Sequence, residues 1–142
     1  MNRDGPGPVA GCHFRVEIVD GNGHAVEVGC AEVIFPTFSV HADSQSPHAE
    51  EQLMLRRACG TDRLLHDWWA KACRGRAPQR RSVRVTLLGP DHERPVQRWR
   101  FRNARPAGLH YSPLNALSAA VAMESLAIAF DSVEIDTGEA AA

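Results

Sequence analysis

The 142-residue sequence predicts a mainly β domain of the α+β type with one flanking helix. Several segments alternate apolar and polar residues with a two-residue period, turn-forming residues separate these segments, and only one segment has helical periodicity. The length is that of one domain and is sufficient for a hydrophobic core. We expect a flexible N-terminal segment at residues 1–11, a single domain at 12–135 and a frayed C-terminal tail at 136–142.

The N-terminal third predicts a hairpin followed by a loop. Residues 12–19 carry apolar side chains at every second position, which is typical of a half-buried strand. Residues 20–23 tolerate positive φ and predict a hairpin turn into a return strand at 25–35. The return strand changes parity near residues 29–32, which indicates a bend. Residues 36–51 have no sustained periodicity and predict a loop.

The middle of the chain predicts a short strand, 52–57, and then the one helix. Thr61 is the expected N-cap of this helix and Gly75 its C-terminal stop. Between them apolar residues recur every three or four positions and form one face. This face consists of Leu64, Leu65, Trp68, Trp69, Ala72 and Cys73. We expect Trp68 and Trp69 to anchor the core.

Three further segments predict the C-terminal half of the domain. Residues 81–88 and 96–104 alternate as two strands joined by a Gly- and Pro-containing turn. The second strand has two expected core anchors on one face and three arginines on the other: Trp99 and Phe101, and Arg98, Arg100 and Arg102. Residues 105–118 predict an irregular connection. Residues 119–135 are predicted to contain a long strand that is covered on both faces.

Charge is unevenly distributed although the net charge is only −1. Residues 74–105 hold ten arginines and two acids, whereas residues 106–142 hold five acids and no base. We call the predicted strand 96–104, with its three arginines on one face, the arginine strand. These arginines have three interpretations: a solvated sheet face, a surface that docks on acidic groups of another copy, and a nucleic-acid-binding stripe. Arg98, Arg100 and Arg102, with the acids Glu124 and Asp131, are therefore candidate subunit-interface residues.

The sequence offers little to a catalyst or a metal ion. No Cys or His pair has the spacing of a zinc site, and phosphate-loop and serine-hydrolase motifs are absent. Cys59, His66 and Cys73 are the one weak sign of a thiol enzyme, and the four cysteines are expected to be reduced. We expect no catalytic, cofactor-binding or metal-binding residues. No apolar stretch is long enough to span a membrane, so we expect no membrane insertion of the monomer.

The motifs, taken in order, resemble the tail tube proteins of contractile phages and the inner tube proteins of extracellular contractile injection systems. The most specific are Trp-x-Phe-x-Asn-Ala at 99–104, Leu-Asn-Ala at 114–116 and Glu-x-Leu at 124–126. The resemblance extends from about Phe14 to Phe130. It implies a tail-tube-like β-barrel or sandwich with a flanking helix, and no catalytic residues.

The resemblance also implies a role. Such proteins form hexameric rings that stack into a hollow tube, work with sheath and baseplate or initiator proteins, and conduct DNA or protein cargo. They assemble in the bacterial cytoplasm and end in a phage virion tail or an extracellular or cell-anchored injection particle. Here residues 36–51 are shorter than the corresponding excursion in the family, and Ala58 and Cys59 replace a common glycine. We therefore expect monomers or short rings in isolation, with long tubes only on a template.

Two alternatives stay open. The first is a baseplate-proximal tube initiator or adaptor of the same machine, in which assembly stops at one ring. The second belongs to a different class: a nucleic-acid-binding β-domain that uses Arg98, Arg100 and Arg102.

Overall fold

The structure is a computed structural model that describes residues 9–39, 52–60, 62–75 and 80–137. The expected N-cap Thr61, most of the expected loop at 36–51 and most of the two expected flexible ends lie outside these residues. The described chain is mainly antiparallel strand with one helix, which confirms the predicted fold class.

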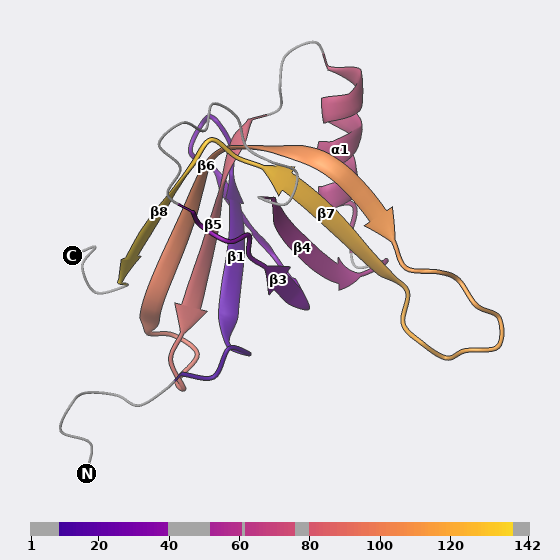
Figure 1. The fold of residues 1–142 in the computed structure, drawn as a ribbon, viewed down its shortest axis with the longest axis horizontal. Coiled ribbons are helices and arrows are strands. Elements are labelled where there is room, and N and C mark those ends of the chain that lie inside the picture. The colour runs from indigo at the N-terminus through magenta and orange to yellow at the C-terminus, as the bar shows by residue number, and fades with distance from the viewer. Residues whose placement is uncertain (1–8, 40–51, 61, 76–79, 138–142) are drawn as a thin grey trace.

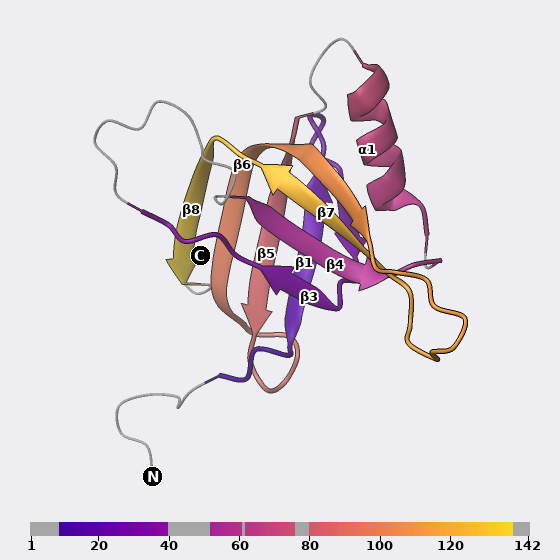
Figure 2. The same ribbon diagram turned by 45° about the vertical axis from the view of Figure 1, so that its right-hand side comes forward.

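In the described residues, eight strands form two layers that share one long strand (Figures 1 and 2). The first layer has the order β2-β1-β5-β6-β8, and the second continues from the other half of β6 through β7 and β4 to β3. Their bounds are β1 Phe14–Val19, β2 Ala25–Val28, β3 Glu32–Ile34, β4 Leu53–Ala58, β5 Arg81–Leu88, β6 Pro95–Tyr111, β7 Met123–Ala129 and β8 Ser132–Thr137.

The bend of β6 at Asn103 joins the layers. The first half of β6 pairs with β5 and β8, and the second half pairs with β7. Asn103 has φ +53°, in the left-handed region that few residues other than Gly, Asn and Asp adopt. The pairing shifts there, since Arg81 lies opposite Ala104 whereas Val83 lies opposite Phe101. This extra residue is a β-bulge, which turns the strand from one layer into the other.

Helix α1, Leu64–Arg74, lies beside the second half of β6 (Figures 1 and 2). Arg63 is the N-cap and makes no capping hydrogen bond through its side chain, whereas the first helical N–H, that of Leu64, donates to the Asp62 carboxylate at 2.8 Å. Gly75 follows the last helical residue, as predicted. The helix buries Leu65 and Trp68, whereas Cys73 is exposed. The buried face of the helix is therefore narrower than the six-residue face that the sequence predicts.

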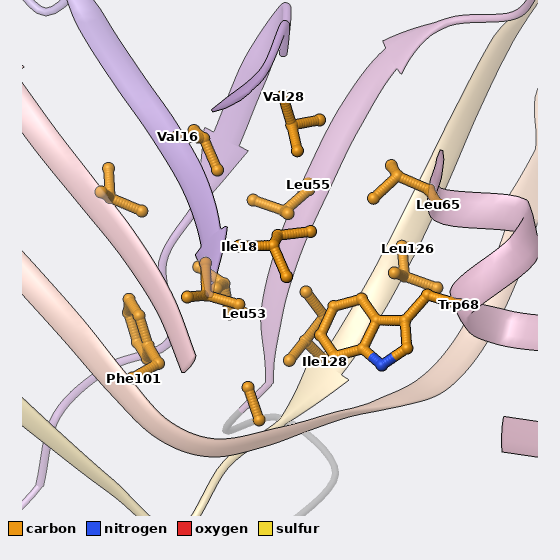
Figure 3. Packing of buried hydrophobic residues seen from close by; sticks show 13 residues of the cluster. Val16, Ile18, Val28, Leu53, Leu55, Leu65, Trp68, Phe101, Leu126 and Ile128 are labelled. Atoms are coloured by element: carbon orange, nitrogen blue, oxygen red, sulfur yellow. The ribbon is translucent and has the colours of Figure 1, made fainter. Parts of the chain in front are cut away.

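The core fills the space between the layers. Trp68 enters it from the helix and lies near Leu126 and Ile128 of β7 (Figure 3). Phe101 is fully buried, while Trp69 and Trp99 are partly buried and pack against the cluster. The Arg81 guanidinium lies 5.2 Å from the Trp68 ring, within cation–π range. Burial of these rings and the inward aliphatic side chains supplies the main stabilising term.

Three sequence predictions are wrong in detail. The strand predicted at 25–35 is divided at the predicted bend into two strands, β2 and β3. β2 pairs with β1, whereas β3 pairs with β4. Residues 105–111 continue β6 despite Pro106 and Gly108, where the ladder tolerates a register shift. The one strand predicted within 119–135 is two strands, β7 and β8, separated at residues 130–131, because they follow the bend of β6.

Candidate assembly surfaces

The side chains of Arg98, Arg100 and Arg102 lie on the outer face of the first layer, because Phe101 between them faces the core. Arg100 and Arg102 of β6 both reach Glu134 of the neighbouring strand β8, at 3.9 and 2.9 Å. Arg98 lies opposite Asp136 in the same ladder. The side chains of Arg100, Arg102 and Glu134 are each about half exposed. Exposed ion pairs of this kind contribute about 0–1 kcal/mol each to stability. The acidic C-terminal segment is thus engaged, at least in part, within the chain.

Asp131 holds the corner between β7 and β8. Its carboxylate accepts hydrogen bonds from Arg105 at 2.9 Å, Asn103 at 3.1 Å and Arg80 at 3.3 Å. The Arg105 hydrogen bond is the main reason why the pKa of Asp131 lies below its ordinary value. The backbone N–H of Asp131 also donates to the carbonyl of Arg102. Asp131 is partly exposed, and its side chain stabilises the bend of β6 from the connection between β7 and β8.

Glu124 has a different environment from the other candidate interface residues. It is 6% exposed, and its carboxylate lies 3.3 Å from Nε of the buried Arg57. Arg57 also contacts Asp62, with Nη2 2.8 Å from Oδ1. The carboxylate of Glu124 is therefore engaged inside the chain and is not free to contact a neighbouring copy. Sequence patterns missed this pair because its members are far apart along the chain.

The thiols and imidazoles do not form a catalytic arrangement in the described residues. His66 contacts Asp67 on the helix and Arg63 just before it, not Cys73. Burial raises the pKa of the Cys30 thiol to about 12, so this sulfur stays protonated and is a poor nucleophile at neutral pH. All four cysteines are free.

A histidine pair near the start of β1 was not expected from the sequence. The rings of His13 and His92 lie 3.8 Å apart between centroids, and Cys12 Sγ lies 3.7 Å from His13 Nε2. Even so, no three His, Cys, Asp or Glu side chains among the described residues are grouped as metal ligands. In that same part of the chain no helix has the length and hydropathy to cross a membrane.

Free strand edges are the clearest feature for assembly. In the first layer β2 pairs only with β1 and β8 only with β6 among the described residues, so both outer edges carry backbone groups without a strand partner. Val26 on β2 and Ile135 on β8 are 48% and 49% exposed. Such edges readily add a strand from another chain. They lie at opposite ends of one layer.

Known proteins share this fold and this sequence pattern. The family model of the T4-like virus tail tube protein gp19 matches residues 10–134. The chain therefore belongs to the T4-like tail tube protein family, which confirms the resemblance given by the motifs. The members and structural neighbours are structural tube proteins rather than enzymes.

Solved structures extend the likeness to the fold of injection-system proteins. A chain of the anti-feeding prophage baseplate, six-fold symmetrised, has a TM-score of 0.74 and 18% identity over 94% of this chain and 99% of that chain. A chain of the PVC sheath-tube complex in the extended state has a TM-score of 0.72 and 16% identity over 92% of each chain. An Hcp crystal structure has a TM-score of 0.61 and 13% identity over 89% and 94%. Among curated proteins, none matches this sequence.

Proposed function

We propose that this chain is a structural subunit of the inner tube of a contractile phage tail or a phage-tail-like injection particle. Copies form hexameric rings, and the rings stack into a hollow conduit for DNA or protein. The partners are further copies of the chain and the sheath and baseplate or initiator proteins of the particle. The chain would act in the virion tail or the injection particle after assembly in the bacterial cytoplasm. No catalytic step is part of this role.

The observation that carries the proposal is the pair of free edges on one layer, in a member of the tail tube family. When β8 of one copy pairs with β2 of the next, the contact joins two different surfaces. A contact of this kind closes into a ring if its rotation divides a full turn. One chain of similar fold comes from a six-fold symmetrised baseplate, which supports six copies.

The arginine strand and Asp131 have a supporting role in this proposal. Arg98, Arg100 and Arg102 lie beside β8, the strand that would meet a neighbour. Their charge would hold the acidic β8 in place and attract acidic groups of the adjoining copy. Asp131 sets the angle at which β8 leaves the corner.

A baseplate-proximal initiator or adaptor is the second candidate. The observation in its favour is that one of the similar folds comes from a baseplate structure. An adaptor would use the same edges to form one ring but would not stack on itself.

The experiment places a charge on each edge. Val26→Lys and Ile135→Lys each put an ammonium group on an edge strand, which natural sheets use to prevent strand addition. We expect both variants to lose rings in native mass spectrometry while remaining folded by circular dichroism. Val26→Thr and Ile135→Thr keep strand propensity and are the matched controls. Wild-type ring mass in both lysine variants would contradict edge pairing.

A further inference from the structure

The loop between β6 and β7, residues 112–122, is apolar and exposed. Leu114, Leu117 and Val121 are 87%, 97% and 66% exposed. None of the eleven residues is charged. The loop extends beyond the two layers in Figures 1 and 2. Large apolar side chains grouped on a projecting segment are a mark of an interaction site.

Hydrogen bonds within the loop fix its conformation. Ser112 N–H donates to the Met123 carbonyl at 2.9 Å, and Met123 N–H donates to the Ser112 hydroxyl at 2.9 Å, which closes its base. Further along, Leu117 N–H donates to the Asn115 side chain at 2.9 Å, and Ala120 N–H donates to the Ser118 hydroxyl at 3.1 Å. A preorganised loop loses less conformational entropy when it binds.

An apolar pocket of about 290 Å³ opens elsewhere on the molecule, beside the start of β1 and the edge strand β3. Its lining includes Phe14, Ala31, Val33, Phe35, Leu87 and Trp99. Among the described residues that line it, Glu32 alone is charged, and it is paired with Arg56 at 3.3 Å. An apolar cavity of about 150 Å³ holds a benzene molecule. The pocket is therefore large enough for a leucine side chain.

We propose that the 112–122 loop of one copy inserts the side chain of Leu117 into this pocket of a second copy. The two surfaces match in chemistry, because an uncharged loop enters a pocket whose one charge is already paired. Burial of a single leucine side chain changes an association constant by about tenfold or more. The inference rests on the proposed self-assembly and adds a second contact, separate from the strand edges.

This contact is again between unlike surfaces of the same chain. The loop comes from the end of β6 and the start of β7, whereas the pocket comes from β1, β3, β5 and the start of β6. A heterologous contact either closes a ring or continues along an axis. A tube needs both kinds of contact, and the strand edges supply only one.

Photocrosslinking tests the contact directly, even when it is weak. A benzophenone amino acid replaces Leu117, and an equal mixture of ¹⁵N-labelled and unlabelled protein identifies links between copies. We expect such links to Val33, Phe35 or Trp99. Asn22, in the turn at the opposite end of β1 from the pocket, is the control position and should give none of these links. Links from position 117 only within one chain, or to other surfaces, would overturn the proposal.

Variant mixing tests whether the contact has two unlike halves. Leu117→Asp blocks the loop, Ala31→Trp fills the pocket, and Leu117→Met keeps an apolar side chain as the control. Each blocking variant should raise the concentration for half-assembly by about tenfold or more while staying folded. Their mixture should recover part of the lost assembly and contain both variants, since each variant retains the half of the contact that the other lacks.

The outcomes separate this inference from the proposed function. Wild-type assembly by the Leu117→Asp and Ala31→Trp variants would overturn the loop–pocket contact and leave the tube role intact. If the wild-type protein neither assembles nor crosslinks between copies, both proposals fail.

Discussion

Arg57 is an unusual residue for a protein core. Its side chain is 1% exposed, and two of its nitrogens, Nε and Nη1, have no partner with hydrogen-bond geometry among the described residues. Glu124 and Asp62 compensate its charge from the start of β7 and the start of the helix. Removing a charge from water costs free energy, and the opposite charge offsets this cost. Loss of one partner therefore leaves an uncompensated buried charge, which destabilises the fold.

Removal of one partner should be more harmful than removal of the buried pair. We expect Glu124→Gln to lower the free energy of unfolding by about 3 kcal/mol, because it leaves the buried guanidinium without its buried counter-charge. Asp62→Asn should cost less, since Asp62 is half exposed. Arg57→Met combined with Glu124→Leu should be close to neutral. Urea denaturation measures all three, and a Glu124→Gln variant as stable as wild type would contradict this interpretation.

Asp131 predicts a pH-dependent contribution to stability. Its hydrogen bond from Arg105 lowers the pKa of the carboxyl in the folded state, so folding favours the ionised form. The stabilisation is present above the unfolded pKa of about 3.9 and is lost as the pH falls through the lower folded pKa. Compared with wild type, Asp131→Asn should be less stable at pH 7, and the difference should shrink below about pH 4. An equal difference at pH 7 and pH 3 would argue against the effect.

At the scale of elements, the bend of β6 joins the two layers through one residue with positive φ. Asn103 adopts φ +53° and donates a hydrogen bond to Asp131. We expect Asn103→Gly to retain the bend and lose only the hydrogen bond. Asn103→Val should cost about 1–2 kcal/mol more, because a β-branched side chain is strained in this region. Equal unfolding midpoints for the Gly and Val variants would show that the bend does not depend on this backbone conformation.

The arginine strand predicts a change in assembly rather than in folding. Replacement of Arg98, Arg100 and Arg102 by glutamate should disfavour rings, because Glu134 would then face like charges and β8 would lose its hold. The exposed pairs are weak, so the monomer should stay folded. Arg63→Glu, at the exposed residue that precedes the helix, is the control. Unchanged ring mass in native mass spectrometry together with lost DNA binding would favour the nucleic-acid-binding alternative.

Local sequence patterns predicted most of the strands and the helix. They did not predict how β6 continues past its bend at Asn103, which only the structure shows. Alternation identifies β1, β5 and the first half of β6 because one face of each is buried. It fails at residues 105–111, where Pro106 and Gly108 resemble a loop but tertiary pairing with β7 maintains the strand. The Arg57–Glu124 pair and the loop–pocket match join segments far apart in the sequence, and no local period records them.

At the scale of the whole molecule, we expect the chain to self-assemble into six-membered rings. Cryo-electron microscopy of the purified protein, concentrated to about 1 mM, tests it most directly. At that concentration even a contact worth about 4 kcal/mol is half formed. We expect closed rings with six-fold symmetry, short rather than stacked into long tubes. Rings of another symmetry, or two-fold symmetric dimers alone, would contradict self-assembly into such rings.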